Sequence, residues 1–187
     1  MTYDIRAYDE QWYASMEPHH EWKERCLFIL LGIIGKPSSY LDIGCGDAHT
    51  VDIMGRITED ALGIDLESSN PIVLPHDLRN PLNLGRKYDL VVSTEVGEHL
   101  PVEVADIYLY SVVRHVGNWL VFSAAHPGQG GYNHINEQPK EYWREKIERF
   151  GLATSPLEEH ISALWQLVVP PEYSWAWQNV MVFKKDR

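Results

Sequence analysis

Cysteine is scarce in this chain of 187 residues, since Cys26 and Cys45 are its only two. Two cysteines cannot form a disulfide framework, so the sequence predicts a protein of a reducing compartment, which we expect to be the cytoplasm. Long apolar runs are also missing. The strongest apolar stretch near the N-terminus, residues 27–34, follows a charged segment and is too short to span a bilayer. We therefore expect no signal peptide and no membrane partner.

Basic residues are few as well. The chain has 16 Lys and Arg against 27 Asp and Glu, a formal net charge of −11, and no basic cluster denser than Lys184-Lys185. A protein that grips nucleic acid through its phosphates needs a positive surface. The charge balance therefore argues against a nucleic-acid partner.

The most informative segment present is Leu41-Asp-Ile-Gly-Cys-Gly-Asp-Ala-His-Thr50. Its first residues form an apolar run that is typical of a buried strand, and Gly44 and Gly46 follow. Glycines at this point let the backbone bend sharply and approach a ligand closely. A strand, a glycine-rich turn and a helix together indicate the first unit of a nucleotide-binding α/β sheet.

The residues around this turn restrict which nucleotide it could bind. A dinucleotide fingerprint needs a third glycine where this chain has His49, and Asp47 lies where a pyrophosphate would sit, so we expect its carboxylate to cap the helix instead. Further carboxylates follow the predicted strands, giving the set Asp42, Asp47, Asp65, Asp77 and Glu95. A negative sheet edge suits a cationic cofactor that carries ribose and adenine without phosphate. S-adenosylmethionine fits this description, whereas NAD and ATP do not.

Four segments carry a family resemblance: LDIGCGDA, GIDLES, HDLRNPLNL and YDLVVSTEVGEHL. They resemble the successive motifs of class I S-adenosylmethionine-dependent methyltransferases over residues 38–125, with Ala48 where the family most often has a third glycine. The resemblance implies a Rossmann-like α/β fold with helices on both faces of a mostly parallel seven-stranded sheet. It implies the order 3-2-1-4-5-7-6 with the last strand antiparallel. We expect one domain, 1–187, with a helical segment over 1–36 and a catalytic core over 37–187.

The pattern of apolar residues and breakers places the main elements. Strands are predicted near 39–44, 61–65, 72–75, 88–94 and 118–124, and residues 179–184 resemble the last, antiparallel strand of the family. Helices are predicted near 48–57, 101–116 and 138–150, with one or two more over 7–34 and a break at Glu17-Pro18. The stretch between Asp65 and Tyr88 has room for one strand and three prolines that disfavour a helix. The sheet is therefore expected to be trimmed near its second and third strands.

The resemblance also implies a set of cofactor-binding residues, with Asp65 at a strand tip holding ribose hydroxyls. The set is Asp42, Gly44, Cys45, Gly46, Asp65, Leu66, Asp77, Leu78 and Glu95.

The stretch Glu95-Val-Gly-Glu98-His99 admits two interpretations. Its E-x-x-E-H pattern resembles a metal-binding stretch in small-RNA 2′-O-methyltransferases and in quinone-biosynthesis O-methyltransferases. Glu95, Glu98 and His99 could then hold Mg²⁺ or a borderline transition metal. The alternative is a packing and capping segment before a helix, and our prediction is that no metal is needed.

A glycine-rich loop over 125–139 is the predicted wall of the acceptor site, because open α/β sheets bind ligands at the carboxyl ends of their strands. Its glycines at 128, 130 and 131 are expected to act as hinges, although a plain surface turn is the alternative. His134 and His126 are the first candidates for the catalytic base and His99 is the third, since imidazole titrates near neutral pH.

Aromatic residues gather in the last quarter and near the start of the chain. They are Trp12, Tyr13, Trp165, Tyr173, Trp175 and Trp177. Packing is the favoured interpretation, and an acceptor pocket with cation–π contact to the sulfonium is the other.

Together these patterns predict a methyltransferase acting on a small-molecule or sugar-like acceptor. Two alternatives stay open at this point. One is a metal-assisted O-methyltransferase acting on an RNA end, and the other is a catalytically silent module that only binds the cofactor.

Overall fold

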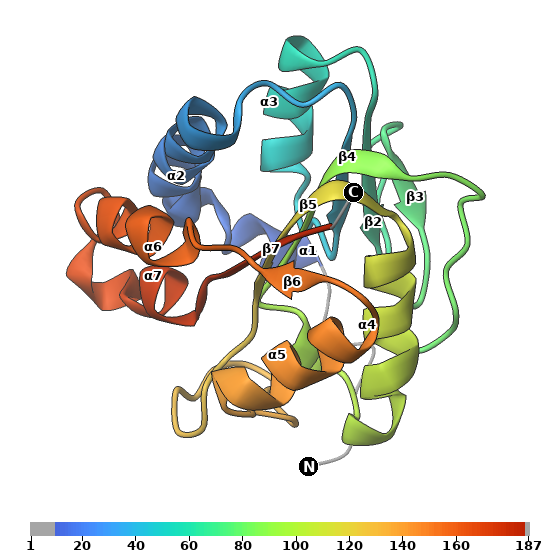
Figure 1. Cartoon of the computed structure of the whole chain (residues 1–187), viewed down its shortest axis with the longest axis vertical. Helices are drawn as coiled ribbons and strands as arrows, with labels where there is room; N and C mark the ends of the chain where they lie inside the picture. Colours follow the sequence, from blue (N-terminus) through green and yellow to red (C-terminus); the bar gives the residue numbers. More distant parts are fainter. Residues whose placement is uncertain (1–9, 186–187) are drawn as a thin grey trace.

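A computed structural model describes residues 10–185 of the chain and contains one seven-stranded sheet (Figure 1). The strands are β1 (Tyr40–Ile43), β2 (Ala61–Asp65), β3 (Val73–Pro75), β4 (Tyr88–Thr94), β5 (Val116–Ser123), β6 (Ala153–Thr154) and β7 (Met181–Lys184). Their order is β3-β2-β1-β4-β5-β7-β6. Strands β1 to β5 pair in parallel, and β7 runs antiparallel to both β5 and β6. The predicted fold class and strand order are confirmed.

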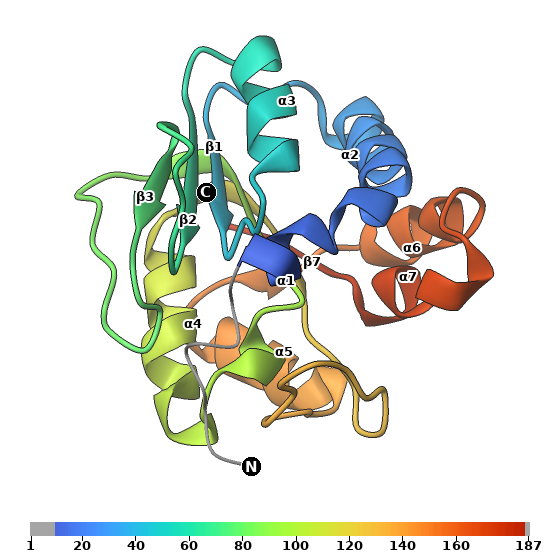
Figure 2. The same ribbon diagram turned by 180° about the vertical axis from the view of Figure 1, so that it is seen from behind.

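Helices cover both faces of the sheet. The α-helices are α1 (Glu10–Ala14), α2 (His20–Ile34), α3 (His49–Ile57), α4 (Ala105–Arg114), α5 (Lys140–Arg149), α6 (Glu158–Gln166) and α7 (Trp175–Asn179). Short 3₁₀ turns are η2 (Glu17–His19), η3 (Gly97–His99), η4 (Val102–Val104) and η5 (Pro171–Tyr173). Helices α4 and α5 pack on one face, and α2, α3, α6 and α7 pack on the other (Figures 1 and 2).

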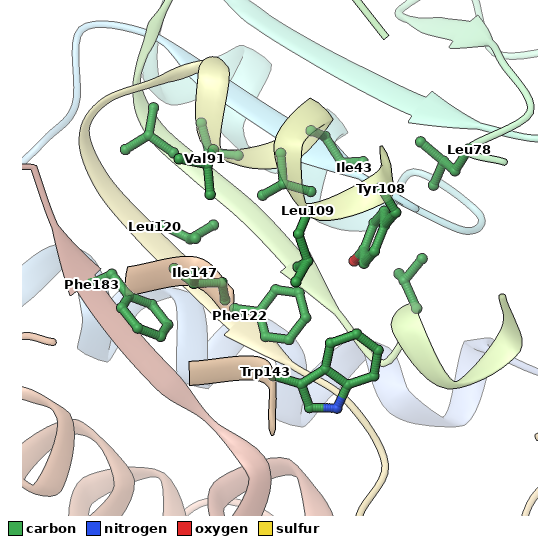
Figure 3. Packing of buried hydrophobic residues seen from close by; sticks show 14 of the residues in the cluster. Ile43, Leu78, Val91, Tyr108, Leu109, Leu120, Phe122, Trp143, Ile147 and Phe183 are labelled. Carbon is green, nitrogen blue, oxygen red and sulfur yellow. The ribbon is translucent and has the colours of Figure 1, made fainter. Parts of the chain in front are cut away.

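Side chains of β1 point alternately to the two faces of the sheet, so the core has two halves: the first lies under α4 and α5 and the second under α2 and α3. Leu41 and Ile43 face α4 and α5, whereas Tyr40 belongs to the cluster beneath α2 and α3. All four residues of β1 are buried, as expected for a parallel strand covered on both faces. Figure 3 shows the first half of the core, in which Trp143 of α5 packs against Phe122 of β5. Burying such a side chain contributes roughly 1.5–3 kcal/mol.

The trimmed edge is present as predicted. No helix occurs between β2 and β4 in the described chain, and this connection carries Pro71 and Pro81 on either side of β3. The N-terminal break falls as predicted too, because η2 at Glu17-Pro18 separates α1 from α2. Residues 7–9 of the predicted helical stretch lie outside the described residues.

Two helices had no sequence prediction: α6 and α7, which precede β7. They carry Trp165 and Trp175, so part of the aromatic group lies on helices that pack near α2. Among the described residues, no helix combines the length and the apolarity needed to cross a membrane.

Candidate functional site

The turn after β1 is built on close approaches that only glycine permits. Gly44 and Gly46 have positive φ angles of 81° and 61°. A Cβ on Gly44 would lie 2.3 Å from Cγ2 of Val96, and one on Gly46 would lie 2.6 Å from Sδ of Met16. The turn is therefore held between the end of β4 and the N-terminal segment.

Asp47 lies two residues before α3 and is not its N-cap residue, contrary to the sequence prediction; Ala48 occupies that position without a side-chain cap. Its carboxylate accepts a hydrogen bond from the backbone N–H of His49 at 3.3 Å and contacts Nε2 of His20 at 2.5 Å. A negative group already fills the position at the helix N-terminus where a phosphate would bind. The geometry agrees with a site that does not receive a pyrophosphate.

Asp65, at the tip of β2, has a carboxylate that accepts three hydrogen bonds. It accepts hydrogen bonds from the N–H groups of Gly46 and Leu66, both at 2.7 Å, and from the phenol of Tyr13 at 2.8 Å. Burial raises the pKa of Asp65, while these three donors oppose the rise. A side chain of α1 thus covers the carboxylate that we expect to hold ribose.

A small cavity of about 90 Å³ opens beside Asp65. Its lining contains Asp65, Leu66, Asp77, Leu78 and Glu95 of the predicted cofactor set. Asp77 is bonded to the guanidinium of Arg79 at 2.6–3.0 Å, and these bonds lower the pKa of its carboxyl.

A larger cavity of about 430 Å³ adjoins the small one and shares Trp12, Met16, Gly44, Gly46, Glu95 and His99 with it. It extends between α2, the face of the sheet and α7. Its lining adds Asp42 and Cys45, so every predicted cofactor-binding residue lines one or both cavities. Asp42 is buried and accepts hydrogen bonds from the hydroxyls of Tyr40 at 2.8 Å and Thr50 at 2.7 Å.

Lys23 is a candidate binding residue that the sequence reasoning missed. It is the only Lys or Arg among the described residues that line these two cavities. Burial lowers the pKa of its ammonium, and nearby carboxylates, with Asp47 the strongest, oppose this. A signal was present in the sequence, because Lys23 lies at helical spacing from the buried Cys26 and Leu27. A lysine at this spacing lies on the apolar side of the helix, so its ammonium group is expected to face the protein interior.

The three histidines nominated as bases are not equivalent. His134 and His99 line the larger cavity, and their rings lie 4.8 Å apart at 84°. Burial and the neighbouring His134 lower the pKa of His99 to about 4. His126 lines neither cavity; its Nδ1 lies 3.1 Å from Oδ1 of Asn179.

The loop that carries His134 is fastened by side chains. Glu137 accepts hydrogen bonds from the N–H groups of Gly128 and Gly130, both at 2.7 Å. Gln129 donates to Glu95 at 2.9 Å, and Asn179 donates to the same carboxylate at 3.2 Å. The glycines at 128, 130 and 131 all have positive φ, and their action as hinges stays a prediction.

The structure groups other residues than the metal-binding set that the E-x-x-E-H pattern suggested, with His134 in place of Glu95. Ligand atoms of Glu98, His99 and His134 lie within 4.8 Å of one another. The carboxylate of Glu95 instead accepts the hydrogen bonds of Gln129 and Asn179. His134, which follows 35 residues after His99, could not be assigned to this group from spacing alone.

Aromatic side chains form much of the wall of the larger cavity. Trp12 stacks on Tyr132 with ring centroids 5.2 Å apart, and Trp22 stacks on Tyr173 at 5.7 Å. Of the aromatic residues singled out in the sequence, Trp12, Trp165, Tyr173 and Trp175 line this cavity, Tyr13 lines the small one, and Trp177 lines neither. Some of these aromatic residues therefore line a cavity, whereas Trp177 only packs within the protein.

Comparison with known proteins gives one family match and many structural matches. A family model described as a methyltransferase domain matches residues 13–120. No curated protein matches the sequence.

Three of the similar solved structures show the extent of the likeness. The chain is similar to DesVI from Streptomyces venezuelae, with 14% identity, a TM-score of 0.67 and full coverage of both chains. It is similar to the sugar N-methyltransferase KedS8 from Streptoalloteichus, with 15% identity, a TM-score of 0.65 and coverage of 90% of this chain and 87% of that one. The SAM-bound amino pentose methyltransferase CalS10 from Micromonospora echinaspora has 12% identity, a TM-score of 0.65 and coverage of 96% and 98%. At these identities the likeness shows the fold.

Proposed function

The chain belongs to the class I S-adenosylmethionine-dependent methyltransferases, and from that premise we propose that it methylates a small-molecule or sugar-like acceptor. The observation that carries the proposal is the pair of adjoining cavities at the carboxyl edge of the sheet. One holds the residues predicted for the adenosine part of the cofactor, and the other has room for its amino-acid part and an acceptor.

The residues that line the small cavity suit adenosine. The carboxylate of Asp65 would accept hydrogen bonds from ribose hydroxyls in place of the phenol of Tyr13. The side chains of Leu66 and Leu78 offer apolar contacts for adenine, with Asp77 beside them. The sulfonium would then point toward the opening shared with the larger cavity.

Lys23 supplies the charge that the other end of the cofactor needs. The amino-acid part of S-adenosylmethionine ends in a carboxylate, and its binding in an acidic cleft requires a cation. The Lys23 ammonium lines the larger cavity together with Gly44, Cys45 and Gly46. We assign it to this carboxylate.

The larger cavity would receive the acceptor. Methyl transfer forms a bond between the acceptor atom and the methyl carbon as the carbon–sulfur bond breaks, which leaves S-adenosylhomocysteine. A hydroxyl or protonated amine acceptor must also lose a proton. His134 is our first choice for this proton, with His99 beside it, because both line the cavity. His126 is assigned a positioning role through Asn179, which bonds to Glu95.

A small acceptor fits this cavity better than a nucleic acid does. The net charge is −11, and of the similar structures KedS8 is a sugar N-methyltransferase and CalS10 an amino pentose methyltransferase. Those substrates belong to those proteins, and they support rather than define the acceptor class proposed for this chain.

Calorimetry and a transfer assay test the proposal. We expect S-adenosylmethionine and S-adenosylhomocysteine to bind at one site, and NAD not to bind. With labelled S-adenosylmethionine, label should pass to members of a panel of amino sugars, hydroxylated sugars and small aromatic alcohols. Cofactor binding with no transfer to any member would favour the silent binding module instead. Absence of cofactor binding would overturn the proposal.

A further inference from the structure

Glu98 is a buried carboxyl group on η3 (Gly97–His99), just after β4. The residue is fully buried, and neither carboxylate oxygen has a hydrogen-bond partner among residues 10–185. Buried polar side chains are almost always hydrogen-bonded, so a buried carboxyl group without such a partner indicates that a group other than the protein, such as an ion, binds there.

Two imidazoles face this carboxylate. Nε2 of His134 lies 4.0 Å from Oε1 of Glu98, and the rings of His134 and His99 are 4.8 Å apart. One ligand atom from each of the three residues can be chosen so that all lie within 4.8 Å of one another. The group therefore offers two nitrogens and one oxygen that converge on a single point.

Both imidazoles are held by groups outside the cluster. Nδ1 of His134 lies 3.2 Å from Oε1 of Glu137, which leaves Nε2 turned toward Glu98. His99 is bonded to the backbone of Asn133. A carboxylate or carbonyl on the far ring nitrogen is the arrangement that fixes the ring and tautomer of a metal-binding histidine.

We propose that Glu98, His99 and His134 bind one divalent transition-metal ion in the wall of the larger cavity. Two imidazoles and a carboxylate suit Zn²⁺, Co²⁺, Ni²⁺ or Fe²⁺, whereas Mg²⁺ and Ca²⁺ favour sites made of oxygen ligands. Ligand bonds of about 2.0–2.2 Å would require the donors to approach one another by roughly 1 Å. The glycines preceding His134 lie on the loop that would make this adjustment.

The cavity side of the ion would be open to a ligand. His99 and His134 line the larger cavity and Glu98 lies behind them, so the three protein donors occupy the wall. A fourth position on the cavity side would accept an oxygen of the acceptor. This consequence rests on the proposed function. It specifies the acceptor atom as a hydroxyl or oxyanion oxygen, whose proton is lost more readily once the oxygen is bound to the ion. His134 would then act as a ligand to the ion rather than as the base.

Metal binding can be measured without cofactor or acceptor. Chelator-treated and dialysed protein is titrated with Co²⁺, with binding followed by visible absorption, and then with Zn²⁺ by calorimetry. We expect one equivalent to bind. Glu98→Gln, which keeps the shape, and His134→Ala should each weaken binding by more than the roughly 10–100-fold that is typical of an outer residue. Glu137→Gln should fall within that range.

His160→Ala is the matched control, because His160 is exposed on α6 and lies outside the cluster. Its Co²⁺ affinity should equal that of the wild type, and thermal unfolding of each variant checks the fold. Failure of the wild type to bind Co²⁺ or Zn²⁺, or binding that survives both Glu98→Gln and His134→Ala, would overturn the inference. Binding of S-adenosylhomocysteine is measured separately. Loss of metal binding alone leaves the proposed function standing, and loss of cofactor binding alone leaves the metal site standing.

Discussion

Asp65 concentrates three hydrogen-bond donors on one carboxylate, and it is the residue with which the cofactor proposal is tested most directly. Asp65→Ala should weaken binding of both S-adenosylhomocysteine and adenosine by roughly 1–3 kcal/mol, because both ligands present ribose hydroxyls. Calorimetry measures the change. Asp60→Asn is the control, since Asp60 precedes the opposite end of β2 and pairs with Arg86. Equal affinities for wild type and Asp65→Ala would remove Asp65 from the ribose site.

Lys23 is assigned to the other end of the cofactor, so its substitution should discriminate between ligands. Lys23→Met keeps an apolar stem but removes the charge. It should weaken S-adenosylhomocysteine by roughly 1–3 kcal/mol and leave adenosine unchanged, because adenosine has no amino-acid carboxylate. Arg25→Met on the exposed side of α2 is the control. A parallel loss for both ligands would indicate a structural role for Lys23 instead.

His134 is assigned to the acceptor side of the site, as a base or as a ligand to a metal ion. His134→Ala should lower the methyl-transfer rate by roughly 10²–10⁴-fold and leave S-adenosylhomocysteine affinity nearly unchanged. His126→Ala should have a smaller effect, because His126 lies outside the cavity lining. Single-turnover rates on the identified acceptor provide the measurement. Wild-type rates in His134→Ala would move the proton-accepting role to His99.

At the scale of elements, the connection between β3 and β4 shows how a loop can replace a helix. The N–H of Leu82 donates to Oγ of Ser111, and the N–H of Leu84 donates to Nε2 of His115, both at 3.0 Å. Ser111 and His115 lie on α4 and just after it. These bonds hold the loop against the first half of the core, where Leu82 is buried.

This anchoring gives the protein a pH-dependent stability. Burial lowers the pKa of His115 in the folded state, where its neutral ring accepts from Leu84 and faces the carbonyl of Ser111 at 2.5 Å. In the unfolded chain His115 binds a proton near pH 6.5, whereas in the folded protein its lowered pKa delays protonation. The contribution of His115 to the free energy of unfolding is therefore fully present above that pH and is lost as the pH falls below it. His115→Ala should cost roughly 1–3 kcal/mol at pH 8. The variant should also lose less of its free energy of unfolding between pH 7 and 5 than the wild type does, as measured by urea unfolding. If the variant lost as much as the wild type, the acid sensitivity would belong to other groups.

Sequence patterns predicted the elements with long or strongly patterned apolar stretches. Strands β2 and β4 match their predicted bounds, and β5 begins two residues before its predicted start. The missed helices α6 and α7 are short, and the prolines at 170 and 171 between them read as loop. Their helical state depends on tertiary packing, of α6 against α2 and β7 and of α7 against α6, which a local pattern does not show.

At the scale of the whole molecule, charge and topology together decide what can approach the site. Strand order and the glycine-rich turn follow from the motifs, so the cofactor residues could be nominated before the structure. That Lys23 and His134 line the same cavity could not be predicted from the sequence, because it depends on how α2 and the 125–139 loop fold back over the sheet edge.

The net charge of −11 predicts how the protein behaves toward polyanions. RNA of random sequence should not be retained at about 0.15 M salt, where long-range attraction to isolated basic groups is largely screened. A filter-binding assay over a salt series tests this, and a basic RNA-binding protein serves as the positive control. Retention that decreases steeply with salt would revive the alternative of an RNA-end acceptor.

The bond between Tyr13 and Asp65 has a consequence for the timing of turnover. If Asp65 holds ribose, the phenol must leave before the cofactor enters and return after the spent cofactor departs. In each catalytic cycle Oδ1 of Asp65 would then exchange the Tyr13 phenol for a ribose hydroxyl and back again, and α1, which carries Tyr13, would move each time. Entry and release of the cofactor would then be coupled to displacement of this short helix from the sheet edge.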